Sequence, residues 1–179
     1  MMEKAIKFHG TESNPSLLFI CGEANLNLGY LIIAQNMFEK CALFPEYEPV
    51  ARRQLGYTYT RQDEPEKAIQ AFRRSLELDT TPLVAAEVGK LYAKKGELTQ
   101  ALDFFTYALD MATADALNVR PEELSDIYLH RVKVYEQMNL LEHAKADYKK
   151  ILEADPSFIQ RQILEQAKAQ DTLQNSIRI

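Results

Sequence analysis

The sequence predicts an all-α protein in which about four helical hairpins stack into a superhelical array, or solenoid. Three observations predict this class. Small residues recur with a period of roughly 34 positions, aromatic residues follow them at a constant offset, and Pro and Gly punctuate the chain at matching intervals. No segment alternates apolar and polar residues as a half-buried strand does.

The repeat is clearest in its glycines and aromatic rings. Gly22, Gly56 and Gly89 lie 34 and 33 residues apart. Twelve residues after each Gly comes an alanine, and four residues later a phenylalanine: Ala34, Ala68, Ala101, Phe38, Phe72 and Phe105. A fourth copy has Ala144 and Tyr148, with Val132 in place of the Gly. Glycine within a helix costs roughly 0.5–1 kcal/mol relative to alanine, so its recurrence indicates that two helices pack closely there.

Helix punctuation defines the individual elements. Asn14 and Thr81 are predicted N-caps that precede a proline, and Pro65 also opens a helix. Gly29 and Gly96 lie where a first helix should end in a left-handed residue. The predicted helices are Pro15–Leu28, Leu31–Phe44, Pro49–Arg61, Pro65–Leu78, Pro82–Lys94, Leu98–Ala116, Pro121–Met138, Leu141–Glu153 and Ser157–Leu173. The last helix, with apolar and charged faces, suits a cap on the array.

These motifs resemble the tetratricopeptide repeat, a helix-turn-helix unit. The closest literal matches are Leu55-Gly56-Tyr57-Thr58-Tyr59 and Ala154-Asp155-Pro156. The resemblance implies an N-terminal extension (1–14), a repeat array (15–157) and a capping helix with a tail (158–179). Within the array the copies are 15–48, 49–81, 82–113 and 125–157, with an insertion near 114–124.

The insertion allows two interpretations. Ala101 and Ala144 are 43 residues apart, about nine more than the other intervals. Both flanking helices can lengthen into an elbow that contributes to ligand binding. Alternatively, the extra residues are a tolerated loop insertion.

Composition and missing motifs exclude several function classes. The net charge of -5 and pI near 5.3 disfavour binding to nucleic acid or anionic lipid. The longest dense apolar run near the start, Leu17 to Cys21, is too short to span a membrane. His9, His130 and His143 are scattered, and the two cysteines have no metal-binding spacing. We therefore expect no enzyme activity, cofactor or metal, and a cytoplasmic, reducing location.

The resemblance also implies where a partner binds, because ligands of this family contact the first helix of each repeat on the concave inner wall. The implied partner-binding residues are Phe19, Glu23, Asn27, Arg53, Gln54, Tyr57, Arg61, Glu87, Lys90, Lys94, His130 and Lys133. Arg53, Arg61, Lys90 and Lys94 against Glu87 alone give the second and third copies a local charge of +3, which favours an acidic segment. Phe19, Ile20 and Leu26 make the first copy apolar. The alternatives are that the charges are a solvated helix face and that residues 1–12 cover the apolar side chains.

The predicted function is a non-catalytic scaffold that binds a partner peptide or protein segment in its concave groove. The expected segment is acidic and carries apolar anchors. Two alternatives remain open: a tetratricopeptide-class secretion chaperone, and a structural module that forms homo-oligomers. The Lys, Asn and Arg set with which some family members clamp chaperone C-termini is absent in either register of the copies.

Overall fold

All regular structure in the described part of the chain is helical. The computed structural model describes residues 14–114, 119–158, 160 and 161. The helices are α1 (Pro15–Asn27), α2 (Leu31–Cys41), α3 (Glu48–Arg61), α4 (Pro65–Leu78), α5 (Pro82–Lys94), α6 (Leu98–Ala114), α7 (Pro121–Gln137) and α8 (Leu141–Ala154). Seven of these eight begin at the residue that the sequence predicts. The all-α solenoid prediction is confirmed.

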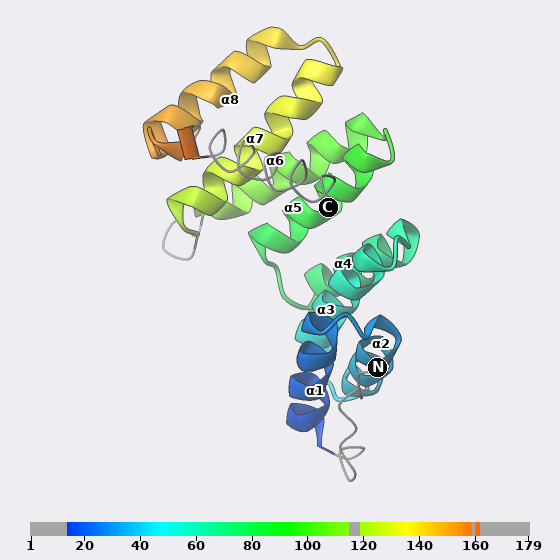
Figure 1. The fold of residues 1–179 in the computed structure, drawn as a ribbon. Coiled ribbons are helices and arrows are strands. Elements are labelled where there is room, and N and C mark those ends of the chain that lie inside the picture. The colour runs from blue at the N-terminus through cyan, green and yellow to red at the C-terminus, as the bar shows by residue number, and fades with distance from the viewer. Residues whose placement is uncertain (1–13, 115–118, 159, 162–179) are drawn as a thin grey trace, which may run out of the picture.

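The helices form four antiparallel hairpins that stack in chain order (Figure 1). Each hairpin pairs an odd-numbered helix with the next even-numbered one, and α2–α3, α4–α5 and α6–α7 join neighbouring hairpins. The array runs from α1 and α2 at the lower end of the view to α7 and α8 at the upper end (Figure 1). The first helices also contact each other directly between α1 and α3 and between α5 and α7. The first helices of neighbouring hairpins therefore adjoin at these two places.

Glycine and phenylalanine set the helix spacing in the first three hairpins. A Cβ atom built on Gly22 would lie 2.6 Å from the ring of Phe38. The same contact would be 2.5 Å between Gly56 and Phe72 and 2.9 Å at the third hairpin. Each of the three Phe rings is fully buried. The ring therefore fills the space that the missing side chain leaves, as the sequence pattern predicts.

The fourth hairpin is held differently. Val132 occupies the position of the glycines and is fully buried. Next to it, Arg131 of α7 donates two hydrogen bonds to the Asp147 carboxylate of α8, Nε to Oδ2 at 2.7 Å and Nη2 to Oδ1 at 2.8 Å. Arg131 Nη1 also donates to the Thr106 hydroxyl of α6 at 3.1 Å. Sequence analysis missed this pair, which connects three helices.

All four hairpins turn through a left-handed residue at the same repeat position. Gly29 and Gly96 have φ of 84° and 78°, as predicted. Asp63 and Asn139 occupy the equivalent positions, and both have φ of 59°. Asp and Asn tolerate this conformation better than other non-glycine residues. The second and fourth hairpins can therefore make the same turn as the first and third without a glycine.

The structure departs from the predictions most clearly at the cap residue Thr81 and at the end of α2. The Thr81 side chain makes no capping hydrogen bond, and only its backbone carbonyl accepts from Val84 N, at 3.1 Å. The cap predicted at Asn14 is present, because Asn14 Oδ1 accepts from Leu17 N at 3.2 Å. Helix α2 ends at Cys41 and not at Phe44. Pro45 explains this end, because it disfavours helical geometry at the residue before it and offers no N–H to the carbonyl four residues back.

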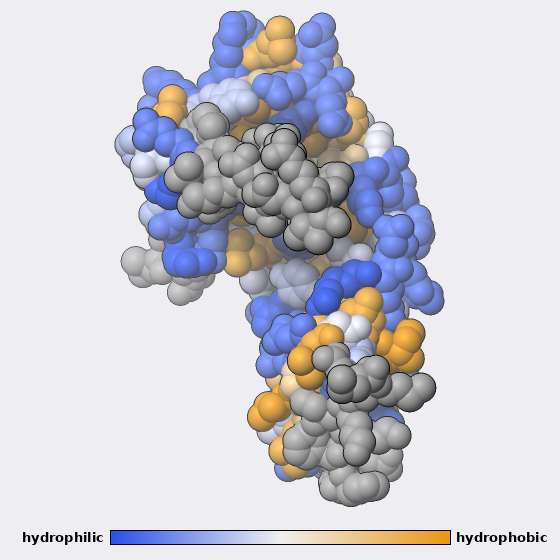
Figure 2. Space-filling model, viewed as in Figure 1, coloured by the Kyte–Doolittle hydropathy of each residue, from blue (hydrophilic) through white to orange (hydrophobic). Residues whose placement is uncertain are grey.

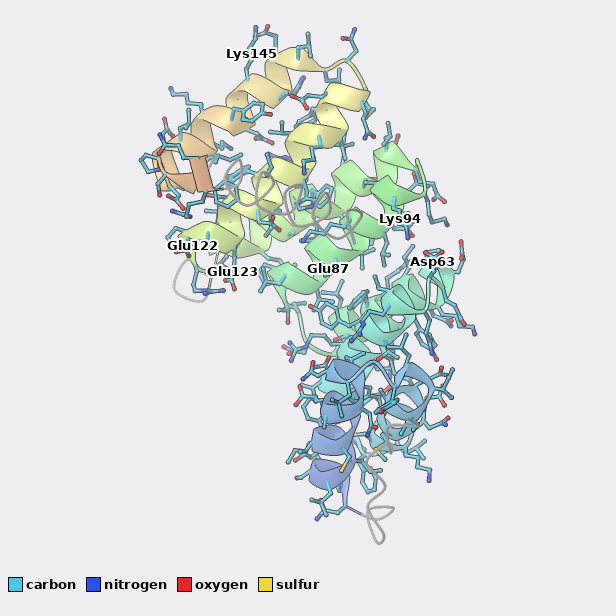
Figure 3. All side chains as sticks on the ribbon, in the orientation of Figure 1. Asp63, Glu87, Lys94, Glu122, Glu123 and Lys145 are labelled. Carbon is cyan, nitrogen blue, oxygen red and sulfur yellow. The ribbon has the colours of Figure 1, made fainter. Side chains whose placement is uncertain are left out.

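The inserted segment lengthens both helices beside it. Helices α6 and α7 each contain 17 residues, whereas the other six contain 11 to 14. Glu123 accepts from Arg120 N at 3.0 Å and so caps the start of α7, where Figure 3 labels it beside Glu122. Residues 115–118 lie outside the described residues, as do the N-terminal extension up to residue 13 and most of the predicted capping helix. Phe158, at the start of that helix, is buried in the core.

Candidate partner-binding site

The predicted inner-wall residues lie on the four first helices, and the second and third hairpins bring several of them together. Lys90 of α5 lies between two carboxylates: its Nζ is 3.1 Å from Glu87 Oε1 and 3.0 Å from Asp126 Oδ2 of α7. Burial of Lys90 opposes its charge, but the attraction of the two carboxylates is larger, so the pKa of Lys90 is raised above its ordinary value. Lys90 therefore links the third and fourth hairpins.

His130 borders the same cluster from α7. Its Nδ1 lies 2.8 Å from the Asp126 carbonyl oxygen, and its ring packs against Phe105 at 6.2 Å. Burial lowers the pKa of His130, and the neighbouring Lys90 acts in the same direction. Lys133, one turn further along α7, is exposed.

Two other predicted cations also have partners within the chain. Lys94 Nζ lies 2.6 Å from Asp63 Oδ1, and Figure 3 shows these two side chains at the seam between the second and third hairpins. Arg61 donates through Nη1 to the Leu26 carbonyl oxygen. Sequence reasoning missed Asp63, which lies in a turn, and did not count Asp126 against the cations. These acids reduce the local positive charge below the +3 counted from Arg53, Arg61, Lys90, Lys94 and Glu87.

Arg53 is the exception among these four cations. Its side chain is half-buried on α3, and it makes no hydrogen bond or ion pair with any residue that the structure describes. Tyr57 lies one turn further along α3, with its ring edge-on to Phe72 at 5.0 Å. Burial raises the pKa of Tyr57, and Glu87 adds to the effect, while the positive charge of Arg53 opposes it. A guanidinium and a phenol thus adjoin on the inner wall.

The predicted residues of the first hairpin differ in their exposure and partners. Phe19 is partly buried against the core cluster, where its ring packs against Phe38 and Tyr47 with centroids 5.9 and 6.3 Å apart. Leu26 is also buried, whereas Ile20 is 59% exposed. Gln54 donates to Glu23 at 2.9 Å and so bridges α3 and α1. Asn27 is exposed at the end of α1.

Sequence reasoning did not find a cleft that lies beside the second hairpin. It is a cleft of about 730 Å³ between α2 and α4, with Leu55 and Tyr59 of α3 among its lining residues. Tyr59 donates to Glu39 at 3.1 Å; burial, together with this acceptor, raises the pKa of Tyr59 to about 12. Arg74 on its rim pairs with Glu48 at 3.0 Å. Arg74 and Tyr59, two of the polar residues of this cleft, therefore already have partners within the chain.

The described residues hold neither a metal-binding cluster nor a membrane-spanning helix. No three His, Cys, Asp or Glu side chains there are placed to hold a metal ion. Among the helices described, none is both long and apolar enough to cross a membrane. Cys21 and Cys41 are buried free thiols, and burial raises the pKa of both.

Known proteins share this architecture. The tetratricopeptide repeat profile matches residues 54–82 and 125–158, whereas no curated protein matches the chain in sequence. A crystal structure of MamA protein superposes with a TM-score of 0.68 at 21% identity, over 82% of this chain and 76% of that chain. A structure of pilF from Pseudomonas aeruginosa superposes with a TM-score of 0.63 at 18% identity, over 86% of this chain and 67% of that chain. A chain of the APC/C hetero-tetramer Cut9-Hcn1 superposes with a TM-score of 0.61 at 18% identity, over 78% of this chain and 27% of that chain.

At these identities the structural likeness shows the fold alone. The two profile matches cover the second and fourth hairpins, and the first and third have the same Gly–Phe contact and left-handed turn as the second. The resemblance found in the sequence is therefore confirmed. The chain contains tetratricopeptide repeats, which the profile recognises in the second and fourth hairpins.

Proposed function

We propose that this protein is a non-catalytic scaffold that holds a segment of another protein against its inner wall, around Arg53 and Tyr57. A tetratricopeptide fold favours protein–protein interaction in general. The observation that carries the more specific proposal is the half-buried guanidinium of Arg53, which pairs with no side chain in the described part of the chain.

A partly buried guanidinium loses part of its hydration, so a ligand carboxylate that accepts two hydrogen bonds from it stabilises the complex. Tyr57 offers an aromatic surface and a hydroxyl next to that site. Since Lys90, Lys94 and Arg61 already have acceptors, the ligand needs one well-placed acidic residue more than a long acidic run. Ile20, exposed on α1, supplies an apolar contact further along the wall. The proposed ligand is thus a segment with an acidic residue beside an apolar anchor.

Arg53→Glu tests this proposal, with Arg73→Glu as its matched control. Arg73 is exposed on α4 and lines the cleft between α2 and α4, away from the first helices. Peptides that combine Asp or Glu with Leu or Phe are displayed on an array, and the affinity of each peptide that binds is measured by fluorescence anisotropy. We expect Arg53→Glu to weaken binding by at least about tenfold, because reversal turns an attraction into repulsion.

The control change should alter affinity much less, since it adds the same charge away from the wall. Circular dichroism shows whether both variants keep their helices. Equal affinity for the wild type and a folded Arg53→Glu variant would contradict the proposal. Reversal of Arg53 together with Lys90 is a less specific test, because a Glu at position 90 would repel Glu87 and Asp126 and destabilise the fold.

A reducing compartment such as the cytoplasm suits the two free thiols. Secretion chaperone activity stays a prediction from the sequence resemblance. A chaperone of that class would keep a secretion substrate soluble in a co-expression assay, and the same Arg53→Glu variant would lose that effect.

A further inference from the structure

The cleft between α2 and α4 lies over a small residue where the third hairpin has an aromatic one. Ala71 lines this cleft, three residues after Ala68, and the residue at the same position of the third repeat is Phe104. Phe104 stacks on Tyr92, with ring centroids 5.5 Å apart. Tyr59, which also lines the cleft, is the equivalent of Tyr92. The second hairpin therefore lacks the ring that stacks on this tyrosine in the third.

The fourth hairpin also supplies a neighbour for its equivalent tyrosine. The guanidinium carbon of Arg131 lies 5.6 Å from the centroid of the Tyr135 ring, and Asp147 holds Arg131 by a hydrogen bond of 2.7 Å. In the second repeat the position of Arg131 is taken by Leu55, which lines the cleft. The space beside Tyr59 thus has an apolar floor.

Arg52 brings a charge to the cleft, at a repeat position where the other hairpins bury their residue. Its side chain is 39% exposed. The equivalent residues are all buried: Leu18, Ala85 and Tyr128. Arg52 Nε makes no hydrogen bond with any residue that the structure describes. It lies 3.5 Å from Glu48 Oε1, an oxygen that already accepts from Arg74 at 3.0 Å. Arg52 therefore retains N–H donors for another acceptor.

Arg73 adds further donors from α4. It is exposed, lines the cleft and pairs with no residue within the described ranges 14–114, 119–158 and 160–161. A third cation, Lys67, lies with its Nζ 5.6 Å from the centroid of the Tyr59 ring and pairs with Glu64 at 2.5 Å.

Three carboxylates line the same cleft, and each already has a partner within the chain. These contacts are the Tyr59 hydroxyl to Glu39 at 3.1 Å, Lys95 to Glu66 at 3.1 Å and Arg74 to Glu77 at 3.2 Å. The cations with donors to spare are Arg52 and Arg73. A carboxylate accepts two hydrogen bonds from a guanidinium, so these two residues favour an acidic group of a ligand over a basic one.

We propose that this cleft is a second partner-binding site, which takes a tryptophan or tyrosine side chain of another protein together with an acidic residue next to it. The ring occupies the space above Ala71 beside Tyr59, as Phe104 does beside Tyr92, and the carboxylate accepts from Arg73 and Arg52. Most side chains that line the cleft are charged or polar, and Figure 2 shows hydrophilic side chains where α4 lies. A ring with a polar edge therefore fits better than phenylalanine.

The size and the place of the cleft agree with this ligand. Its volume of about 730 Å³ lies within the range of pockets that enclose a bound group. Arg53 and Tyr57 of the inner wall are not among its lining residues. The two sites are therefore separate, and either proposal can fail without the other.

The probe is a peptide in which Trp lies between two Asp residues, because the chain itself contains no Trp. Tryptophan fluorescence then reports only on the peptide, and its emission shifts to the blue when the indole ring leaves water. The full chain is titrated into the peptide, and the emission and its anisotropy give the affinity.

Two variants of the cleft should each weaken binding at least about tenfold. Ala71→Phe places a ring where the third hairpin has Phe104, and so fills the space meant for the indole. Arg73→Glu repels the carboxylates of the peptide. The controls are Arg53→Glu on the inner wall and Lys149→Glu, which changes the same repeat position as Arg73 on α8 at the other end of the array. Both controls should bind the peptide about as tightly as the wild type.

A wild-type chain that does not bind this peptide overturns the proposal. A folded Arg73→Glu variant with wild-type affinity also overturns it, and this exposed change decides the matter if circular dichroism shows that Ala71→Phe misfolds. Loss of binding in Arg53→Glu alone would place the peptide on the inner wall. That result removes the cleft site and leaves the first proposal intact.

Discussion

Arg131 and Asp147 form a two-pronged ion pair inside the fourth hairpin, with N–O distances of 2.7 and 2.8 Å and both side chains nearly inaccessible to water. Removal of one partner leaves the other charge buried without compensation. We expect Asp147→Ala to lower the free energy of unfolding by about 3–5 kcal/mol. Urea denaturation followed by circular dichroism measures this loss.

The exposed pair Lys145–Glu142, 2.7 Å apart on α8, is the matched control for that prediction. Lys145→Ala should leave the unfolding free energy almost unchanged, because water screens exposed pairs. Arg131→Met combined with Asp147→Leu should recover much of the stability that Asp147→Ala loses, since no lone charge remains. Equal losses from the buried and the exposed single changes would show that burial does not decide the cost.

Gly56→Leu should destabilise the second hairpin strongly. A Cβ atom at Gly56 would already lie 2.5 Å from the Phe72 ring, and the leucine adds three more carbons. We expect a loss of at least about 1–3 kcal/mol in thermal or urea unfolding. Gly56→Ala with Phe72→Leu makes room for the added methyl group and should be more stable than Gly56→Ala alone. A double variant no better than the single one would contradict the proposed contact.

Asn139→Ala should cost about 1 kcal/mol, because alanine lacks the local hydrogen bonding that helps asparagine to hold a positive φ. Asn139→Gly should be neutral or slightly stabilising, since glycine adopts this conformation without steric penalty. The pair of variants is compared by chemical denaturation. A difference of zero between them would mean that the turn relaxes out of the left-handed region. Asn139 suits this test better than Asp63, which also pairs with Lys94.

Stability should fall as the pH drops below about 6.5, partly through His130. Burial and Lys90 lower its pKa in the folded protein, while Asp126 opposes them and Lys133 adds to the lowering. The unfolded imidazole therefore binds a proton first as the pH falls, so the stabilising contribution of neutral His130 is full above the unfolded pKa and is lost below it. His130→Gln should flatten the pH profile of the unfolding free energy as the pH falls below about 6.5, the ordinary pKa of an unfolded imidazole. The same change at the exposed His143 is the control, and an identical slope in the two variants would contradict this role.

The fold follows from local rules that the sequence displays. Small residues at Gly22, Gly56 and Gly89 can be recognised by spacing alone, because close helix contact excludes larger side chains. The Arg131–Asp147 pair could not be found in this way, since its partners are 16 residues apart on different helices and no repeat signal marks them. A signal for the left-handed turns was present in Asp63 and Asn139, which occupy the repeat position of Gly29 and Gly96.

The candidate site was harder to predict than the fold. Its cations could be assigned to the inner wall from the repeat register, but their ion pairs depend on how neighbouring hairpins stack. Lys94 meets Asp63 across a seam between hairpins, which no spacing within one repeat encodes. Phe19 shows the same limit: the repeat register places it on the first helix, but its packing against Phe38 of α2 depends on how the two helices meet.

The seam between the second and third hairpins carries ion pairs at its rim, Lys94 with Asp63 and Lys95 with Glu66. Salt weakens exposed pairs of this kind, whereas it does not weaken the Gly–Phe contacts inside each hairpin. Added salt should therefore loosen only the rim of this joint, because the apolar core that runs from α4 into the third and fourth hairpins holds it closed beneath the charges.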